Sequence, residues 1–268
     1  MAEAIKKSFI KNGLIYDIDK YNESKNGKVI YEVLRISKGK PLFFEEHYQR
    51  FINSIKLTGL DFYVDESWLR TCILKLVGHE KLTSENIKIT YDSETTDLKI
   101  FVIKHKYPTL KVYSEGVDTI LYFGERTNPN AKVVNSEFRS AVNEEIKRRG
   151  VYEAILVSNN GIVTEGSKSN IFMIKGDVLY TSELKDVLQG VTRTEIIKVA
   201  EENNIKVVEG DIKYLELNSF DALFISGTSP NILPIKSVEG HEFDTKNNLL
   251  RELMRLFKAK IKTYLEEK

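Results

Sequence analysis

Strand-like and helix-like segments follow one another in this chain without a regular order. Runs rich in β-branched residues, typical of strands, are interspersed with segments whose apolar residues recur at helical spacing. The predicted strands lie at residues 28–36, 86–92, 98–106, 117–123, 153–158, 170–175, 178–182 and 221–227, and the predicted helices at 45–59, 66–80, 135–150, 191–204 and 247–268. A doubly wound parallel sheet would need regular strand–helix alternation, so the pattern favours an α+β fold.

The length of the chain allows two domains. Its 268 residues are enough for one large core or two of ordinary size. The segment 107–116 is polar and contains one proline and one glycine, which is typical of a linker. We therefore expect a small N-terminal domain over residues 1–108 and a larger domain over residues 109–268.

The composition excludes several classes of function. Lys plus Arg number 40 and Asp plus Glu 39, so no long-range field attracts nucleic acid or an anionic membrane. Cys72 is the single cysteine, so no internal disulfide can form. Together with the lack of a visible signal peptide, this predicts a cytoplasmic protein. Cys72 itself is predicted to pack in the core on a helix. The four histidines are scattered without ligand spacing, so no metal site is expected.

Lys132 is a candidate nucleophile. Most lysines are solvated surface amines, but Val133 and Val134 follow this one and indicate a partly buried position. A desolvated lysine has a lowered pKa and is a usable amine nucleophile near neutral pH.

Glu165 interrupts an apolar pattern in the stretch GIVTEGSKSNIF, residues 161–172. Small or polar residues follow it before Ile171 and Phe172. The simple interpretation is a surface turn. The alternative is a carboxylate that holds a positive charge from outside the protein.

Three further stretches are candidate anion sites. Gly190 precedes a predicted helix that carries Thr192 and Glu195, which is either an ordinary capping box or a helix start that seats a phosphate on its free N–H groups. The stretch ISGTSPN, residues 225–231, ends a strand in glycine and hydroxyls. Arg50 lies on a predicted helix, and arginine is the side chain best shaped to grip a phosphate.

Together and in this order, these stretches resemble the fold-type IV pyridoxal-phosphate enzymes, the class IV aminotransferases. That family includes branched-chain and D-amino-acid aminotransferases and aminodeoxychorismate lyase. The resemblance covers residues 29–235 and is carried by YEVLR, EEHYQRF, AKVVN, GIVTEGSKSNIF, LQGVTR and ISGTSPNILPI. It implies a two-domain fold with a small N-terminal α/β domain and a larger C-terminal β-rich domain with helices, which binds the cofactor.

The resemblance also implies a role for each residue. Lys132 matches the lysine that bonds to the aldehyde of pyridoxal 5′-phosphate, and Glu165 matches the carboxylate beside the pyridine nitrogen. The phosphate would be held by Arg50, by the amides of Val191 and Thr192, and by Thr228. The substrate side would be lined by Tyr31, Asn170 and the turn that contains Ser229. Members of the family are homodimers, which we carry over as an expectation.

The sequence departs from the family pattern in the substrate region. Tyr91 and Asp92 stand where the D-amino-acid branch has an arginine for the substrate carboxylate. Arg35 lies four residues after Tyr31 on one predicted strand and so on the same face. We expect Arg35 as the carboxylate partner, ahead of Lys104 and His105.

Three functions fit these residues. The first is an aminotransferase that moves an amino group between an α-amino acid, branched-chain or other, and a 2-oxo acid. The second is aminodeoxychorismate lyase, which uses the same lysine and glutamate to release pyruvate and 4-aminobenzoate. The third is a binding protein that keeps the fold without turnover. The substrate pocket, and not the shared motifs, separates the first two.

Overall fold

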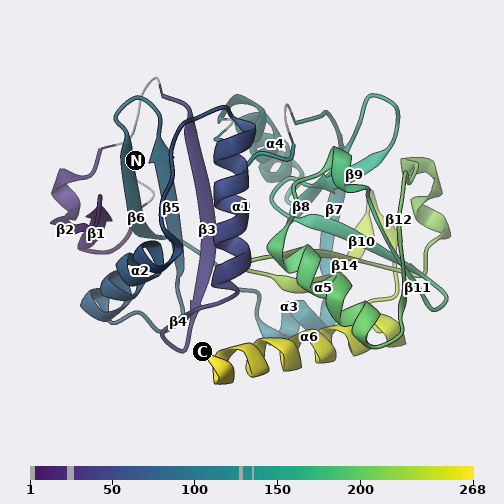
Figure 1. Ribbon diagram of the computed structural model, residues 1–268. Helices are drawn as coiled ribbons and strands as arrows, with labels where there is room; N and C mark the ends of the chain where they lie inside the picture. The colour runs from purple at the N-terminus through teal and green to yellow at the C-terminus, as the bar shows by residue number, and fades with distance from the viewer. Residues whose placement is uncertain (1–3, 23–26, 127–128, 135) are drawn as a thin grey trace. The chain divides into compact units, whose positions relative to one another are not determined.

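The computed structural model describes residues 4–22, 27–126, 129–134 and 136–268, and the chain forms two compact units (Figure 1). Unit 1 comprises Met1–Lys106, Ala131–Val134 and Ile261–Lys268, and unit 2 comprises Tyr107–Asn130 and Asn135–Lys260. Each unit has its own sheet, and strands and helices are mixed in both. The α+β prediction is therefore confirmed.

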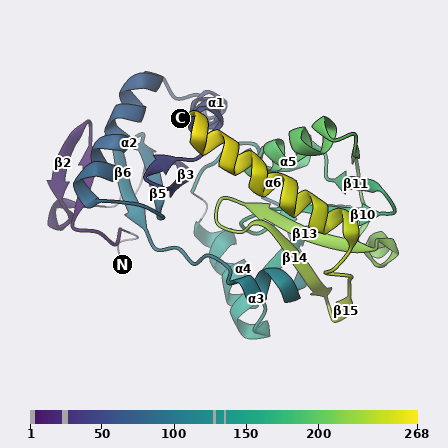
Figure 2. The same cartoon turned by 90° about the horizontal axis from the view of Figure 1, so that it is seen from below.

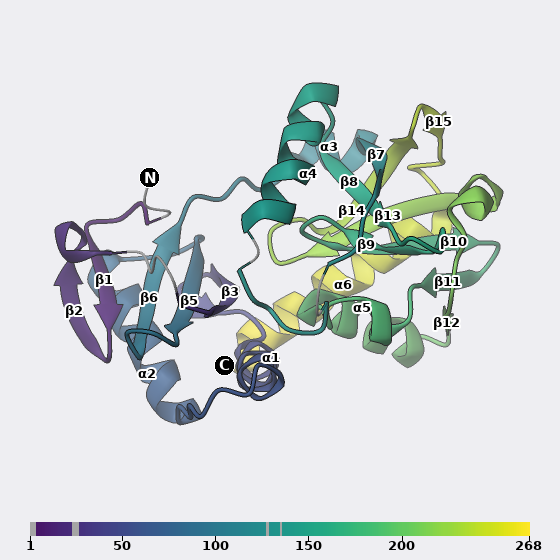
Figure 3. The ribbon, with the colours of Figure 1, turned by 90° about the horizontal axis from the view of Figure 1, so that it is seen from above.

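Unit 1 is built on a six-stranded antiparallel sheet with two helices on one face. The strand order is β2 (Leu14–Asp17), β1 (Ser8–Lys11), β6 (Asp97–Ile103), β5 (Asn86–Asp92), β3 (Val29–Ser37) and β4 (Lys40–Pro41). Alternate residues of β3 point to opposite faces. Ile30, Leu34 and Ile36 face the core under the helices, and Tyr31 and Arg35 lie on the other face, as predicted for a single strand. Figure 3 shows both helices on the same side of this sheet.

Helix α1 (Phe44–Leu57) and helix α2 (Glu66–Glu80) cover the apolar face. Phe51 and Ile55 are buried there, as their spacing predicts, but Leu57 is 55% exposed. The sequence pattern predicts Leu57 in one apolar stripe with Phe51 and Ile55, but Leu57 is the last residue of its helix and lies beyond the stripe that meets the sheet, so this prediction was wrong. Cys72 is buried in the same core, which confirms its packing role.

A short segment from the middle of the chain pairs with β3. The N–H of Tyr31 donates to the carbonyl of Lys132 at 3.0 Å, and Ile30 and Val133 form an antiparallel bridge. The Lys132 N–H donates to Ser54 Oγ on α1 at 3.2 Å. These bonds fix the backbone of Lys132 beside Tyr31.

Unit 2 is built on a nine-stranded mixed sheet. Its order is β12 (Lys206–Glu209), β11 (Val178–Thr181), β10 (Asn170–Lys175), β13 (Ala222–Gly227), β14 (Asn231–Val238), β7 (Val117–Phe123), β8 (Glu153–Val157) and β9 (Val163–Gly166), with β15 (His241–Glu242) paired to β14. Helix α4 (Ser136–Arg149) and helix α5 (Val191–Glu202) lie on opposite sides of it (Figures 2 and 3). Apolar residues fill both faces, which explains the continuous apolar runs in β8 and β10.

The segment predicted as a linker contains a helix. Residues Leu110–Glu115 form α3, because Thr109 caps its start and Val112 and Tyr113 pack on the unit 2 core. The terminal helix α6 (Asn248–Glu267) is amphipathic, as predicted. Its last residues belong to unit 1, where Tyr264 accepts a hydrogen bond from the Phe44 N–H at 2.9 Å and donates to Glu45 at 2.6 Å.

The remaining short helices are 3₁₀ turns: η1 (Ile18–Lys20), η2 (Leu184–Asp186) and η3 (Tyr214–Ser219). Among the described residues, no helix is long and apolar enough to cross a membrane.

The apolar stripe of α1 gives a matched test of packing. Phe51 is fully buried, so Phe51→Ala should lower the free energy of unfolding by about 3–5 kcal/mol through lost transfer energy and the cavity left behind. Leu57→Ala on the same helix should change it by less than about 0.5 kcal/mol. Urea unfolding followed by circular dichroism measures both, and equal losses would contradict the packing described for α1.

Candidate functional site

The Lys132 side chain lies against the ring of Tyr31. Its Nζ is 4.8 Å from the ring centroid, within the range of a cation–π contact, and the side chain is half-buried. A second ammonium, that of Lys88 on β5, lies 4.9 Å from the same centroid. The half-buried position of Lys132 agrees with the environment that its valine flank predicts.

Arg50 is held by a buried carboxylate. Its Nε donates to Glu32 Oε2 at 2.8 Å and its Nη2 to Oε1 at 2.5 Å, while His47 Nδ1 lies 3.0 Å from Oε1. Glu32 is fully buried. Burial by itself would raise the pKa of Glu32, but the charge of Arg50, aided by His47, outweighs it and holds that pKa far below its usual range.

The same cluster keeps His47 neutral. Burial lowers the pKa of His47, and the attraction of Glu32 only partly opposes this. A guanidinium carries five N–H donors, so a two-point pairing with Glu32 is compatible with an anion on another edge of Arg50. Glu32 thus fixes the direction of the guanidinium.

In unit 2, Glu165 lies on β9 and is only 3% exposed. Its Oε1 accepts from Arg126 Nη1 at 2.8 Å, and its Oε2 accepts from the Leu188 N–H at 3.1 Å. Asn170 on β10 donates to the Leu188 carbonyl at 2.9 Å. The buried acid and Asn170 therefore both hold the loop that leads into α5.

Thr192 and Glu195 do not form a capping box at the start of helix α5, which was one of the two interpretations of this stretch. Gly190 is the residue that precedes the helix, no side chain caps the first turn, and Glu195 pairs with Lys198 instead. Val191 and Thr192 are the first two residues of the helix and both are buried. A Cβ on Gly190 would lie 2.0 Å from Asn170 Oδ1, so only glycine fits here. The first amides of α5 thus remain uncapped by side chains.

Thr228 and Ser229 lie in the turn between β13 and β14. Ser226, one residue before Gly227 at the end of β13, pairs with Asn170 across the sheet. The Ser226 hydroxyl is buried, and its Oγ has no hydrogen-bond partner among the described residues. The turn is thus connected through β13 to the strand that carries Asn170.

Each unit contains part of the predicted site. Unit 1 contains Tyr31, Arg35, Arg50 and Lys132, of which Lys132 lies against Tyr31, and unit 2 contains Glu165, Asn170, Val191 and Thr192, with Thr228 and Ser229 at the end of β13. Sequence reasoning missed Glu32, His47 and Arg126. The stretches YEVLR and EEHYQRF contain the first two, but their pairing depends on the β3–α1 contact, which no local pattern reveals.

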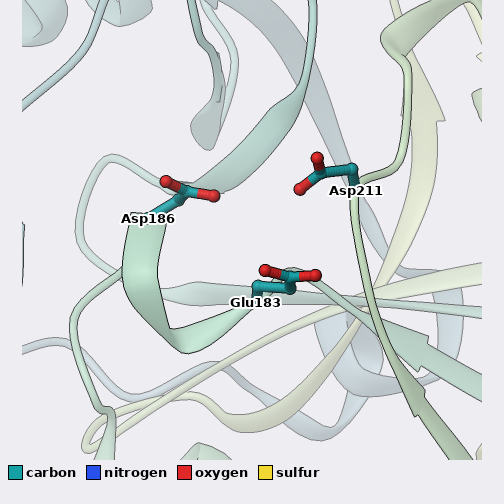
Figure 4. A group of neighbouring side chains, drawn as sticks. All are labelled: Glu183, Asp186 and Asp211. Atoms are coloured by element: carbon teal, nitrogen blue, oxygen red, sulfur yellow. The ribbon is translucent and has the colours of Figure 1, made fainter.

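A cavity of about 400 Å³ in unit 2 has Arg126 and Glu165 in its wall, together with Lys185, Asp186 and Asp211. Figure 4 shows Asp186 and Asp211 with Glu183 as three neighbouring carboxylates. The Lys185 Nζ lies 2.6 Å from Glu183, 3.9 Å from Asp186 and 3.6 Å from Asp211. This ammonium offsets one of the three negative charges of the group.

A family model described as amino-transferase class IV matches residues 29–238. The chain belongs to the class IV aminotransferase family. Enzymes of this class transfer amino groups with pyridoxal 5′-phosphate as cofactor.

Characterised relatives agree with this assignment. The chain is 27% identical over 230 residues to the D-alanine aminotransferase of Bacillus licheniformis, covering 80% of each protein. It is 29% identical over 238 residues to the branched-chain-amino-acid aminotransferase of Salmonella typhimurium, covering 80% of this chain and 77% of that one. The structure of the branched-chain aminotransferase of Thermoproteus uzoniensis with norvaline superposes with a TM-score of 0.87 at 22% identity, covering 97% and 96%. The fold-type IV prediction is thereby confirmed.

The residues present fit the aminotransferase cofactor. An uncapped helix start and an arginine suit a phosphate, the Lys132 amine suits an aldehyde, and a buried carboxylate suits a protonated ring nitrogen. The absence of a side chain at Gly190 leaves room for the Asn170 side chain beside the helix start.

The Glu32 cluster predicts a pH dependence. Because the pKa of Glu32 is lower in the folded than in the unfolded chain, its ionised form stabilises the fold above a pH of about 4.5, and this contribution is lost as the pH falls. Glu32→Gln should therefore reduce the free energy of unfolding at pH 7 by about 3 kcal/mol, because it leaves Arg50 buried without its counter-charge.

The difference in the free energy of unfolding between Glu32→Gln and the wild type should shrink below pH 4.5. Urea titrations between pH 7 and pH 3 measure it, and Glu94→Gln, an exposed acid of unit 1, is the control. A difference that stays constant across that range would show that the ionised carboxylate is not what stabilises the cluster.

Proposed function

We propose that this aminotransferase moves an amino group between an α-amino acid and a 2-oxo acid, with a branched-chain or similar apolar amino acid as donor. When bound, pyridoxal 5′-phosphate supplies an aldehyde that takes up the amino group and a ring that accepts electrons from the substrate Cα. The observation that carries the proposal is the pair of prepared groups, the half-buried Lys132 amine and the buried Glu165 carboxylate.

Lys132 is assigned two tasks. Its Nζ would hold the cofactor through the aldehyde. As a free amine, the same nitrogen would take up the proton from the substrate Cα and later release it, acting first as base and then as acid. The contact with the Tyr31 ring supports this assignment, because it holds Nζ at one place rather than in solvent.

Glu165 is assigned to the pyridine nitrogen, which it keeps protonated. Its contacts with Arg126 and with the Leu188 N–H hold the buried carboxylate in one orientation. Arg126 balances the charge of Glu165 while the carboxylate is buried.

The phosphate is assigned to Arg50, the amides of Val191 and Thr192, and Thr228. The uncapped start of α5 and the fixed guanidinium of Arg50 support this grip. Tyr31, Arg35, Asn170 and Ser229 are assigned to the substrate side. Of these, Tyr31 and Arg35 share one face of β3.

Release of pyruvate and 4-aminobenzoate by aminodeoxychorismate lyase is the weaker alternative, because it needs the same lysine and glutamate but the named relatives transfer amino groups. A binding protein without turnover would not need both the half-buried Lys132 amine and the buried Glu165 carboxylate. We also propose that the protein is a homodimer in the cytoplasm and that its domains divide after residue 108. Its proposed partners are small amino acids and 2-oxo acids, and not nucleic acid or a membrane.

The test of Lys132 is spectroscopic. The purified protein with pyridoxal 5′-phosphate should show the visible absorption of a lysine-bound cofactor, and this band should disappear when an amino donor is added. Lys132→Ala should lack the covalently bound band, and Lys147→Ala, an exposed lysine of α4, should keep it.

The outcomes separate the three functions. A band that donors bleach and 2-oxo acids restore supports the aminotransferase. Pyruvate formed from aminodeoxychorismate without any 2-oxo acid would point to the lyase, and a protein that takes up no cofactor would point to the binding protein.

Glu165→Gln tests the role of the buried acid. A neutral amide cannot keep the ring nitrogen protonated, so bleaching by the best donor should slow on the order of 100-fold, as when one stabilising group of an active site is removed. Stopped-flow absorbance measures the rate, with Glu144→Gln on α4 as the control. Unchanged bleaching in Glu165→Gln would remove the carboxylate from the mechanism.

A further inference from the structure

One buried acid of unit 2 has no part in the function proposed above. Glu153 is the first residue of β8 and is 5% exposed. Its Oε1 accepts from the Ser167 hydroxyl and, at 3.2 Å, from the N–H of Ala154. Its Oε2 accepts from Ser169 Oγ at 3.3 Å. Glu153 thus acts as a hydrogen-bond acceptor for two serine hydroxyls.

The two serines belong to the turn that directly follows Glu165. This turn comprises residues 166–169 and joins β9 to β10, and we call it the serine turn. The Gly166 N–H donates to the Ser169 carbonyl at 2.8 Å, and the Ser167 N–H donates to the Ala154 carbonyl at 2.9 Å. A Cβ on Gly166 would lie 2.1 Å from Ser169 Oγ, so a side chain there would displace the hydroxyl. The serine turn is thus closed on itself and tied to β8 at both serines.

Glu165 lies where the strand pairing is irregular. The β8–β9 ladder pairs Val163 with Val157 and Gly166 with Ile155. Two residues of β9, the second of them Glu165, therefore oppose a single residue of β8. Such a β-bulge interrupts the ladder and changes the direction of the side chains in it. Regular pairing resumes only at the serine turn, so the bonds that hold this turn also hold the bulge.

The serine turn separates the two side chains that hold Leu188. Glu165 Oε2 accepts from the Leu188 N–H at 3.1 Å, and Asn170 Nδ2 donates to the Leu188 carbonyl at 2.9 Å. Glu165 and Asn170 flank the turn, so a change in its shape changes the position of one relative to the other. The bond of the Leu188 N–H therefore reports the direction of the Glu165 carboxylate.

We propose that Glu153 is a positioning residue that fixes the direction of the Glu165 carboxylate through the two serines of the turn. This inference rests on the proposed function, in which Glu165 keeps the ring nitrogen protonated. A carboxylate displaced by about 1 Å loses a hydrogen bond whose length is about 2.8 Å. Glu153 acts through Glu165 and is not itself a catalytic residue.

The experiment is a double-mutant cycle. Glu153→Leu removes both acceptor oxygens, and it should slow bleaching of the visible band by the best donor about tenfold, because a displaced Glu165 protonates the ring nitrogen less well. In the Glu165→Gln background, Glu153→Leu should slow bleaching less than about twofold, because the group through which Glu153 acts is already removed. Stopped-flow absorbance measures both effects. Equal slowing in the two backgrounds would show a general structural effect and would overturn the proposal.

Two further variants test the hydrogen bonds themselves. Burial raises the pKa of Glu153, and the hydrogen bonds from Ser167 and Ala154 only partly oppose this, so an uncharged amide of the same shape suits the site. Glu153→Gln should therefore bleach within about threefold of the wild type. Ser167→Ala combined with Ser169→Ala removes the same bonds from the turn and should slow bleaching as Glu153→Leu does. This double variant decides the question if Glu153→Leu does not fold.

A second measurement needs neither cofactor nor turnover. Hydrogen exchange of the Leu188 amide, followed by NMR in the protein without cofactor, reports the bond of this amide to Glu165. Glu153→Leu should speed this exchange about tenfold. Thr119→Val is the matched control, because it removes a buried hydrogen bond to the Ser237 carbonyl elsewhere in the same sheet. Thr119→Val should leave the Leu188 exchange and the bleaching rate as in the wild type.

The outcomes are distinct from those of the proposed function. If the wild type shows no visible band, the proposed function fails, and the Leu188 exchange still decides whether Glu153 positions Glu165. A Leu188 amide that exchanges at the wild-type rate in Glu153→Leu would overturn the proposal. Faster exchange throughout unit 2 would assign Glu153 to general stability and would overturn it as well.

Discussion

The pairing of residues 131–134 with β3 is the constraint on which the reactive part of unit 1 depends. Backbone bonds fix position far better than a flexible side chain can, and here they come from both sides. Tyr31 donates to the Lys132 carbonyl, and Ser54 accepts from the Lys132 N–H. An amine on a long, rotatable stem reacts efficiently only when the rotamers available to it are few. The bridge and the Tyr31 ring together provide that restriction for Lys132.

Both units pair a buried acid with an arginine, and in both the acid directs a functional group. Glu32 orients the guanidinium of Arg50, and Arg126 balances Glu165. An isolated buried charge would cost several kcal/mol, so each acid is retained only with its partner. The structural consequence is preorganisation, because the groups that would meet the cofactor already have fixed directions. In the third acidic group, Lys185 offsets only part of the charge of three carboxylates.

The sequence predicted the α+β class, most helices and strands, and the short stretches that carry the site. These are local features, set by periodicity and by residue type at fixed spacing. It did not predict the partners of those residues. Glu32 and His47 meet Arg50 because β3 packs on α1, and Arg126 meets Glu165 across many intervening residues. The exposure of Leu57 and the helix within the expected linker were missed for the same reason, since each depends on tertiary contacts.

The register of β5 decides which of its residues lie on the face of Tyr31. Successive residues of a strand face opposite sides, so Lys88 and Tyr91, three residues apart, lie on opposite faces of the sheet. The face of Tyr91 is closed by the core, where its ring stacks on Phe62. The face of Lys88 is the one that carries Tyr31. A side chain at position 91 therefore points towards the helices, and only the even-numbered positions of β5 share a face with Tyr31.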